Sequence, residues 1–336
     1  MTRIVFTCGD VNGIGPEIAV KAFKKILKSK NTNQIIFVCP KNVFEYYYKL
    51  TDAKFKFKIV DNQSFFSTSY LNVLLLPDTR TKLGYPTKVS GKIAYHSIIK
   101  SLELIDNNFA DVLVTSPISK EAFSLAEIDF PGHTELLAKH ENNNNYMMLF
   151  LSNKINAGLL TIHSPISKIS RLIKKDKIIK AIELINLTAR KDLMIENPKI
   201  AVLGLNPHAG ENGLIGNEET EIVAPAIKSL QKRFDVSGPF VPDAFWGNKT
   251  YKKFDMILGM YHDQILIPFK LLNFNNGVNF TAGLKLIRTS PDHGTAYDIA
   301  GLNKADESSI LQSYKYAIKI FQNRNRSIAE SKSKSN

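Results

Sequence analysis

Three histidines each end a short apolar run, and they are the residues best suited to metal chemistry. His163 follows the run 158–162, His208 follows 202–207, and His262 follows 256–261. If these runs are neighbouring parallel strands, all three imidazoles emerge at the sheet edge where open α/β sheets bind ligands. Three neutral imidazoles with an open fourth position hold catalytic zinc and other first-row ions. The alternative is that each histidine is a structural partner in a polar loop.

A glycine-rich turn separates the first apolar run from the first helical pattern. Gly9, Gly13 and Gly15 precede Pro16, which suits the first position of a helix. Such a turn either lets an anion approach the helix N-terminus or is a tight structural turn, and the sequence leaves both open. It is no dinucleotide fingerprint, because Ile18 stands at the third glycine position, and no Gly-Lys-Ser/Thr follows.

A further set of residues is suited to binding an anion: His133, Thr134, Lys270, Asn279 and Arg288. Lysine and arginine form charge-assisted hydrogen bonds to phosphate or carboxylate, and threonine and asparagine fix the orientation of the bound group. Taken individually, each of these residues fits a surface position better. Their spacing alone indicates no site.

Short β-branched runs that alternate with amphipathic segments must position these side chains. We predict strands at 3–7, 34–39, 73–76, 111–115, 157–162, 199–205 and 255–260. We predict helices at 16–27, 91–106, 167–190, 219–234 and 308–322, and a frayed end from 327. The alternation favours the α/β class with parallel βαβ units. No Pro/Ser-rich linker is evident, so we expect domains that share the chain by crossing over.

The composition excludes several classes of protein. The chain has 336 residues, enough for about two domains, and 44 Lys+Arg against 31 Asp+Glu give a net charge of +13. The lysines recur between apolar residues at helical spacing, which indicates solvated helix faces and no nucleic-acid partner. No apolar run suits a membrane span or a signal peptide. Two cysteines, Cys8 and Cys39, make no disulfide framework, so we expect a reducing cytoplasmic compartment.

Six segments together resemble the 4-hydroxythreonine-4-phosphate dehydrogenase family, the NAD-dependent enzymes of pyridoxal 5′-phosphate (vitamin B6) biosynthesis. They are 9–17, 116–121, 131–135, 205–211, 261–264 and 287–296, and the resemblance runs from about 3 to 302. The stretches Asn-Pro-His-Ala-Gly-Glu at 206–211 and Tyr-His-Asp-Gln at 261–264 are its most specific parts.

The resemblance implies an isocitrate/isopropylmalate dehydrogenase-like fold with two α/β/α domains and a central cleft. We expect a discontinuous cofactor-side domain, 1–130 plus 276–336, and a second domain, 131–275, with the metal ligands and dimer contacts. The family is a homodimer whose active site lies at the subunit interface. No membrane or nucleic-acid partner is implied.

The resemblance also assigns site residues. The metal ligands fall on His163, His208 and His262, and the substrate residues fall on His133, Thr134, Lys270, Asn279 and Arg288. The segment 292–301 looks like an adenosine-binding loop, which places NAD or NADP near His293 and Asp298, with Gly13 and Gly15 as further cofactor residues. The resemblance implies one divalent ion per site, and zinc, magnesium and cobalt are the candidates. Asp243 and Lys120 are candidates for the general base, and Asp263 is expected to orient a metal ligand.

The implied reaction oxidises the C3 hydroxyl of 4-phosphooxy-L-threonine. Hydride passes to NAD⁺, and the resulting 2-amino-3-oxo-4-phosphooxybutanoate loses CO2 to give 3-amino-2-oxopropyl phosphate.

The alternative functions are a related dehydrogenase of 4-phospho-D-threonate or 4-phospho-D-erythronate, an acyl-phosphate transferase and a basic nucleic-acid-binding protein. Val11 and Asn12 replace an expected Pro-Ala, and Asn212 and 214–215 change the stretch after His208.

Overall fold

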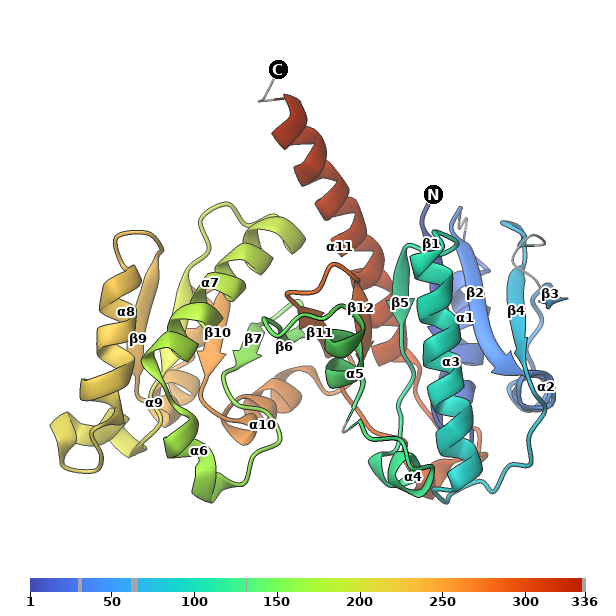
Figure 1. The fold of residues 1–336 in the computed structure, drawn as a ribbon, viewed down its shortest axis with the longest axis horizontal. Helices are drawn as coiled ribbons and strands as arrows, with labels where there is room; N and C mark the ends of the chain where they lie inside the picture. Colours follow the sequence, from blue (N-terminus) through green and yellow to red (C-terminus); the bar gives the residue numbers. More distant parts are fainter. Residues whose placement is uncertain (30–31, 62–65, 131, 334–336) are drawn as a thin grey trace. The chain divides into compact units, whose positions relative to one another are not determined.

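The computed structural model describes residues 1–29, 32–61, 66–130 and 132–333 (Figure 1). It contains two compact units, and each is built from separate stretches of chain. The first unit comprises Met1–Asn142 and Lys285–Phe321, and the second comprises Asn143–Leu284 and Gln322–Asn336. The domain limits expected from the sequence stay a prediction.

The first unit contains a fully parallel run of strands in the order β3-β4-β2-β1-β5-β12. The strands are β1 (Arg3–Thr7), β2 (Gln34–Pro40), β3 (Phe57–Val60), β4 (Leu71–Leu76), β5 (Val112–Val114) and β12 (Arg288–Pro291). Its helices are α1 (Gly15–Ile26), α2 (Lys41–Leu50), α3 (Lys88–Asp106), α4 (Lys120–Leu125) and α5 (His133–His140). Every residue of β2 is buried, as expected for a strand covered on both faces.

The second unit contains a mixed run of strands in the order β11-β6-β7-β10-β8-β9. These are β6 (Met147–Leu151), β7 (Asn156–Leu159), β8 (Ile200–Leu203), β9 (Val236–Phe240), β10 (Met256–Gly259) and β11 (Val278–Ala282). The pairs β11·β6 and β6·β7 are antiparallel, whereas β7, β10, β8 and β9 run parallel. Its helices are α6 (Ile166–Leu172), α7 (Lys175–Asp192), α8 (Ala224–Leu230), α9 (Pro242–Gly247) and α10 (His262–Asn273).

The α/β class is confirmed, and each of the seven predicted strands coincides with an observed one. Three predicted helices differ from the observed ones. The predicted helix 167–190 is two helices, because the chain is extended at Ile173, whose side chain is fully buried. The segment 219–234, predicted as one helix, begins with a single π-helical turn at Glu219–Val223, and α8 follows it. The expected frayed end is wrong up to Ser333, because α11 runs through Ser308–Ser333.

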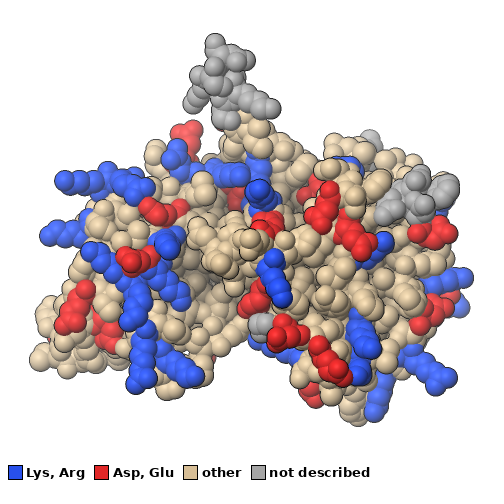
Figure 2. Space-filling view, in the orientation of Figure 1, with Lys and Arg blue, Asp and Glu red and all other residues tan. Residues whose placement is uncertain are grey.

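The surface and the cysteines agree with the sequence interpretation. Figure 2 shows Lys and Arg side chains spread over the visible face, with Asp and Glu side chains between them. Both cysteines are buried free thiols. In the described ranges, no helix is both long enough and apolar enough to span a membrane.

Candidate active site

The three histidines follow three strands that are neighbours in the second unit. His163 follows β7, His262 follows β10 and His208 follows β8, and β10 pairs in parallel with both other strands. The carboxyl ends of these strands therefore lie side by side, as the apolar runs predicted. All three histidines are exposed at that edge.

His208 lies in a loop with an unusual backbone. Residues 208–212 of Pro207–Gly213 all have positive φ, between 43° and 80°, although only one of them is glycine. Non-glycine residues in this region cost about 1–2 kcal/mol each, so the surrounding structure must enforce the conformation. The buried carboxylate of Glu219 fixes the backbone just before this stretch: its Oε1 accepts hydrogen bonds from the backbone N–H groups of Leu205 (2.6 Å) and Asn206 (2.8 Å). Strain of this kind at a strand end favours a functional role for the loop.

Gln264 connects the segments that carry His208 and His262. Its buried side chain accepts a hydrogen bond from Met260 N (2.7 Å) and donates one to the carbonyl of Gly204 (2.7 Å). Thr161 Oγ1 in turn donates to the carbonyl of Met260 (2.6 Å), which ties the β7 end to the β10 end. The backbones before all three histidines are therefore fixed relative to one another.

The imidazoles suit a first-row divalent ion by their donor chemistry. The rings of His163 and His262 lie 6.1 Å apart between centroids. Nδ1 of His262 lies 2.7 Å from Oδ1 of Asp263, and because a carboxylate only accepts, this contact leaves Nε2 of His262 with a lone pair. In the part of the chain that the structure describes, no three His, Cys, Asp or Glu side chains are grouped as they would be around an ion. The assignment of His163, His208 and His262 as ligands stays a prediction.

The first unit contains a buried group suited to an anion. Arg288, on β12, is 3% exposed, and its Nε donates to Thr115 Oγ1 at 2.8 Å. Burial lowers the pKa of its guanidinium to about 9, while the negative charge of Glu135 raises it, so the group is cationic at neutral pH. Burial, and then the charge of Arg288, hold the pKa of His133 well below its usual range, so this imidazole is neutral.

The cluster around Arg288 also contains a polar atom that is not hydrogen-bonded. Within the described ranges, Nε2 of His133 is buried and has no hydrogen-bond partner. His133 and Thr134 are the first two residues of α5, where backbone N–H groups and the helix dipole favour negative charge. A buried cation, an unsatisfied imidazole nitrogen and a helix N-terminus together make a site that a phosphate or carboxylate group would complete.

The other expected substrate residues, Lys270 and Asn279, belong to the second unit. Lys270 is half-buried on α10, and Asn279 lies on β11. Oδ1 of Asn279 is buried and, among the described residues, has no partner. This amide oxygen can still accept a hydrogen bond.

The chain matches a known family. A family model described as "Pyridoxal phosphate biosynthetic protein PdxA" matches residues 30–317. The chain belongs to the PdxA family. It is 40% identical, over 96% of its own length and 90% of the relative's, to the 4-hydroxythreonine-4-phosphate dehydrogenase of Bacteroides thetaiotaomicron.

Two further comparisons bear on the fold and the substrate. The crystal structure of 4-hydroxythreonine-4-phosphate dehydrogenase from Klebsiella pneumoniae is similar, with a TM-score of 0.82 and 35% identity, covering 96% of this chain and 100% of that one. The D-threonate 4-phosphate dehydrogenase of Pectobacterium atrosepticum is 36% identical, covering 95% of this chain and all of the relative. The family therefore contains proteins named for at least two different substrates.

In this PdxA family member the geometry favours the structural interpretation of the glycine-rich turn. A Cβ atom at Gly13 would lie 2.7 Å from the carbonyl oxygen of Thr295, and one at Gly15 would lie 2.5 Å from that of Cys8. Gly9 has a φ of +66°. The glycines thus let protein backbone approach protein backbone, and the cofactor role of Gly13 and Gly15 stays a prediction.

The remaining expected residues lie on the surface of their units. His293 and Asp298 belong to the loop after β12, and Lys120 is the exposed first residue of α4. Asp243 is exposed in the first turn of α9. Thr115, Glu219 and Gln264 support the site, although no site role was predicted for them. Two of them carried a usable signal: Thr115 comes directly after β5, and Gln264 lies in the Tyr-His-Asp-Gln stretch at 261–264.

Proposed function

We propose that this protein oxidises 4-hydroxythreonine 4-phosphate (4-phosphooxy-L-threonine) with NAD⁺ or NADP⁺, in the biosynthesis of pyridoxal 5′-phosphate. Relatives that carry the name of this dehydrogenase match nearly the whole chain. The observation that carries the proposal is the buried Arg288 beside the neutral His133 and the α5 N-terminus, because a phosphorylated substrate needs such a site.

His163, His208 and His262 would hold one divalent ion, zinc, magnesium or cobalt. When bound, the ion lowers the pKa of the substrate hydroxyl and stabilises negative charge on the adjacent oxygens. Asp263 keeps the His262 ring in the tautomer that offers Nε2 as a ligand. Gln264 and Glu219 hold the backbones that present His262 and His208.

The chain's own residues then position the substrate. Arg288 and Thr134 bind an anionic end, and His133, neutral at physiological pH, donates a hydrogen bond to it from Nε2 without adding charge. Lys270 and Asn279 bind a second polar end of the substrate. Holding both ends fixes the C3–H bond toward the nicotinamide, which removes the entropy cost of finding that pose during the reaction.

The reaction also requires a group that accepts the C3 hydroxyl proton. Lys120 and Asp243 are our candidates for that base. The oxidised product is a β-keto acid, and its carbon–carbon bond to the carboxylate breaks to release CO2, leaving 3-amino-2-oxopropyl phosphate.

We propose that the active form is a homodimer. The residues Ile267, Leu271 and Phe274 are spaced four and three residues apart, on one face of α10 and its C-cap. Their side chains are 58%, 82% and 78% exposed, respectively. A cluster of large exposed apolar side chains marks a protein contact surface, and α10 begins with the expected metal ligand His262. The two buried free thiols support a reducing, cytoplasmic location.

The deciding experiment follows NADH formation at 340 nm with purified protein, NAD⁺, a divalent metal and 4-phosphooxy-L-threonine. We expect turnover that EDTA abolishes and that added zinc, cobalt or magnesium restores. A parallel reaction with NADP⁺ establishes the preferred nucleotide. A protein that is active without any divalent ion would contradict the metal assignment.

A second candidate is oxidation of 4-phospho-D-threonate, because one relative of similar identity carries the name D-threonate 4-phosphate dehydrogenase. Both substrates have the phosphate that the Arg288 group suits. At C2 the first has an amino group, whereas the second has a hydroxyl group. The same assay with 4-phospho-D-threonate and 4-phospho-D-erythronate separates the two functions. If only a D-substrate is oxidised, the proposed site residues stand, but the protein belongs to a different pathway.

A further inference from the structure

A buried carboxylate holds the loop 292–301 from inside the first unit. The hydroxyl of Tyr297 donates a hydrogen bond to Oδ2 of Asp10 at 2.8 Å, and Asp10 is fully buried. Ser90 Oγ donates to the same oxygen at 3.0 Å, and the backbone N–H of Asn12 donates to Oδ1 at 2.9 Å. Burial raises the pKa of Asp10, and the three donors oppose that rise by favouring the carboxylate.

The middle of the loop is packed on the glycine-rich turn. The N–H of Ile14 donates to the carbonyl of Thr295 at 2.9 Å, and Thr295 fills the space beside Gly13. The next residue, Ala296, has a φ of 42°, which costs free energy for any residue with a Cβ. The strained backbone therefore depends on its neighbours on both sides, Thr295 and Tyr297.

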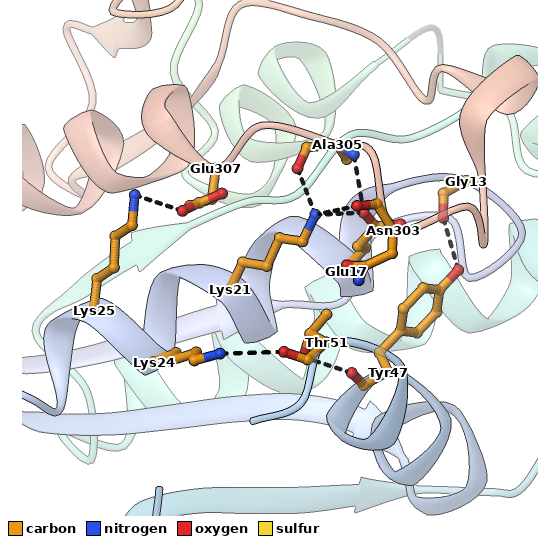
Figure 3. Close-up of polar contacts among 10 residues, drawn as sticks. All are labelled: Gly13, Glu17, Lys21, Lys24, Lys25, Tyr47, Thr51, Asn303, Ala305 and Glu307. Carbon is orange, nitrogen blue, oxygen red and sulfur yellow. Dashed lines mark hydrogen bonds and ion pairs between the residues drawn. The ribbon is translucent and has the colours of Figure 1, made fainter. Parts of the chain in front are cut away.

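The chain beyond the loop has separate anchors on α1 (Figure 3). Glu17 Oε1 accepts from the N–H of Ala305 at 2.9 Å, and Lys21 Nζ donates to the carbonyls of Asn303 (3.1 Å) and Ala305 (2.8 Å). Lys25 pairs with Glu307 at 2.6 Å. These contacts fix 303–307, so Tyr297 is the side chain that ties the loop itself to Asp10.

The outer edge of the loop stays open. Asp298 is exposed, His293 is half-buried, and a Cβ added to Gly294 would meet no atom within 4 Å. The loop follows the carboxyl end of β12, the side of a parallel sheet where ligands bind. One face of the loop is thus fixed by the protein while the other presents polar groups to solvent.

We propose that Asp10, acting through Tyr297, is a positioning residue for the dinucleotide cofactor. It holds the loop in the conformation in which His293 and Asp298 meet the adenosine end. This inference rests on the proposed function, because it requires that the protein bind NAD(H). Neither Asp10 nor Tyr297 needs to touch the reacting atoms.

The test compares Tyr297→Phe, which removes only the hydroxyl, with wild type and with Tyr48→Phe. Tyr48 is a matched control because its hydroxyl donates to the carbonyl of Phe55 (2.8 Å) in the same unit, away from the loop. We expect Tyr297→Phe to weaken NADH binding, measured by NADH fluorescence titration, about tenfold, the effect of losing one hydrogen bond to a charged acceptor. The kcat at saturating cofactor and the KM for the phosphorylated substrate should change less than about twofold, because positioning for binding leaves the chemical step intact.

A second variant, Asp10→Asn, tests the carboxylate itself. An amide at position 10 has one acceptor oxygen where the carboxylate uses two oxygens for three donors, so we expect Asp10→Asn to weaken NADH binding as well. The double variant should bind more tightly than the sum of the two single effects predicts, because both substitutions act on the same contact. Faster amide hydrogen exchange in 293–298, with the rest of the unit unchanged, is the accompanying structural signature.

The outcomes separate the two hypotheses. If the wild type binds NADH, and Tyr297→Phe binds it as tightly as Tyr48→Phe does, this inference is overturned and the proposed function stands. A loss of kcat with no change in NADH affinity also overturns it. Wild type that binds neither NADH nor NADPH overturns the proposed function and this inference with it.

Discussion

Nδ1 of His262 lies 2.7 Å from Oδ1 of Asp263, the next residue along the chain. Because a carboxylate only accepts hydrogen bonds, the contact places the ring proton on Nδ1 and leaves the lone pair on Nε2. Both residues lie in the first turn of α10, so the helix itself brings the carboxylate beside the ring.

We therefore expect Asp263→Ala to weaken divalent metal binding about tenfold, the lower end of the range for groups that orient a metal ligand. The measurement is a zinc or cobalt titration against a chelator of known affinity. Asp176→Ala is the control, because Asp176 is an exposed acidic residue in the first turn of α7 of the same unit. Equal affinities in the two variants would remove Asp263 from the site.

His208→Ala and His133→Ala should separate metal binding from substrate binding. We expect His208→Ala to lose bound metal and activity together, because two imidazoles hold a divalent ion poorly. His133→Ala should retain metal and show a raised substrate KM or a lowered kcat, because its buried ring belongs to the Arg288 group. Metal content by elemental analysis and initial rates decide the result. If His208→Ala kept both metal and activity, the ligand assignment would be wrong.

The strands before the three histidines were the part of the fold most accessible from the sequence. The runs before His163, His208 and His262 are apolar and β-branched, and they form parallel neighbours as predicted. The conformation of the loop that carries His208 was not accessible, because it depends on the left-handed backbone at 208–212 and on the contacts that Glu219 makes just before it.

Three of the strands missed have local patterns that do not indicate them. β12 reads Arg-Thr-Ser-Pro, yet it is buried within the sheet, where it pairs with β5. β9 contains Gly238-Pro239, a pair typical of loops. β11 pairs antiparallel with β6, a pairing that the parallel βαβ pattern did not indicate. Tertiary contacts, which a single sequence does not show, decide these segments.

The lowered pKa of His133 predicts a dependence of stability on pH. Below its ordinary pKa of 6.5 the unfolded chain binds a proton at this histidine while the folded protein does not. The folded state therefore loses stability as pH falls through 6.5, by up to about 1.4 kcal/mol per pH unit for this one group.

Urea unfolding at pH 7.5 and pH 5.5, without substrate, measures this effect. Wild type should lose more stability on acidification than His133→Asn, which has no proton to bind. His96→Asn is the control, since His96 is exposed on α3, and it should behave like wild type. Identical pH slopes in wild type and His133→Asn would mean that His133 is protonated in the folded protein.

A buried ion pair attaches α11 to α7 within the second unit. Arg324 Nε and Nη2 donate to the two carboxylate oxygens of Asp192 at 2.7 and 3.1 Å, and the two side chains are only 10% and 4% exposed. Removing one partner leaves the other charge buried, so we expect Asp192→Ala to lower the free energy of unfolding by about 3–5 kcal/mol. The exposed pair Arg326–Glu330, on the same helix, is the matched control, and Glu330→Ala should cost less than about 0.5 kcal/mol.

The apolar face of α10 predicts the oligomeric state. Leu271 and Phe274 are among the most exposed large apolar side chains of the described structure, so a stable monomer would leave both in water. We expect wild type to sediment as a dimer, and Leu271→Glu with Phe274→Glu to sediment as a monomer, because an interface that buries two carboxylates without partners is strongly disfavoured. Leu187→Glu, at a residue 56% exposed on α7, is the control for a charge added to an exposed leucine of the same unit. If the monomeric variant retained wild-type activity and metal content, each chain would contain a complete active site. If it folded but lost activity, the partner subunit would complete the site.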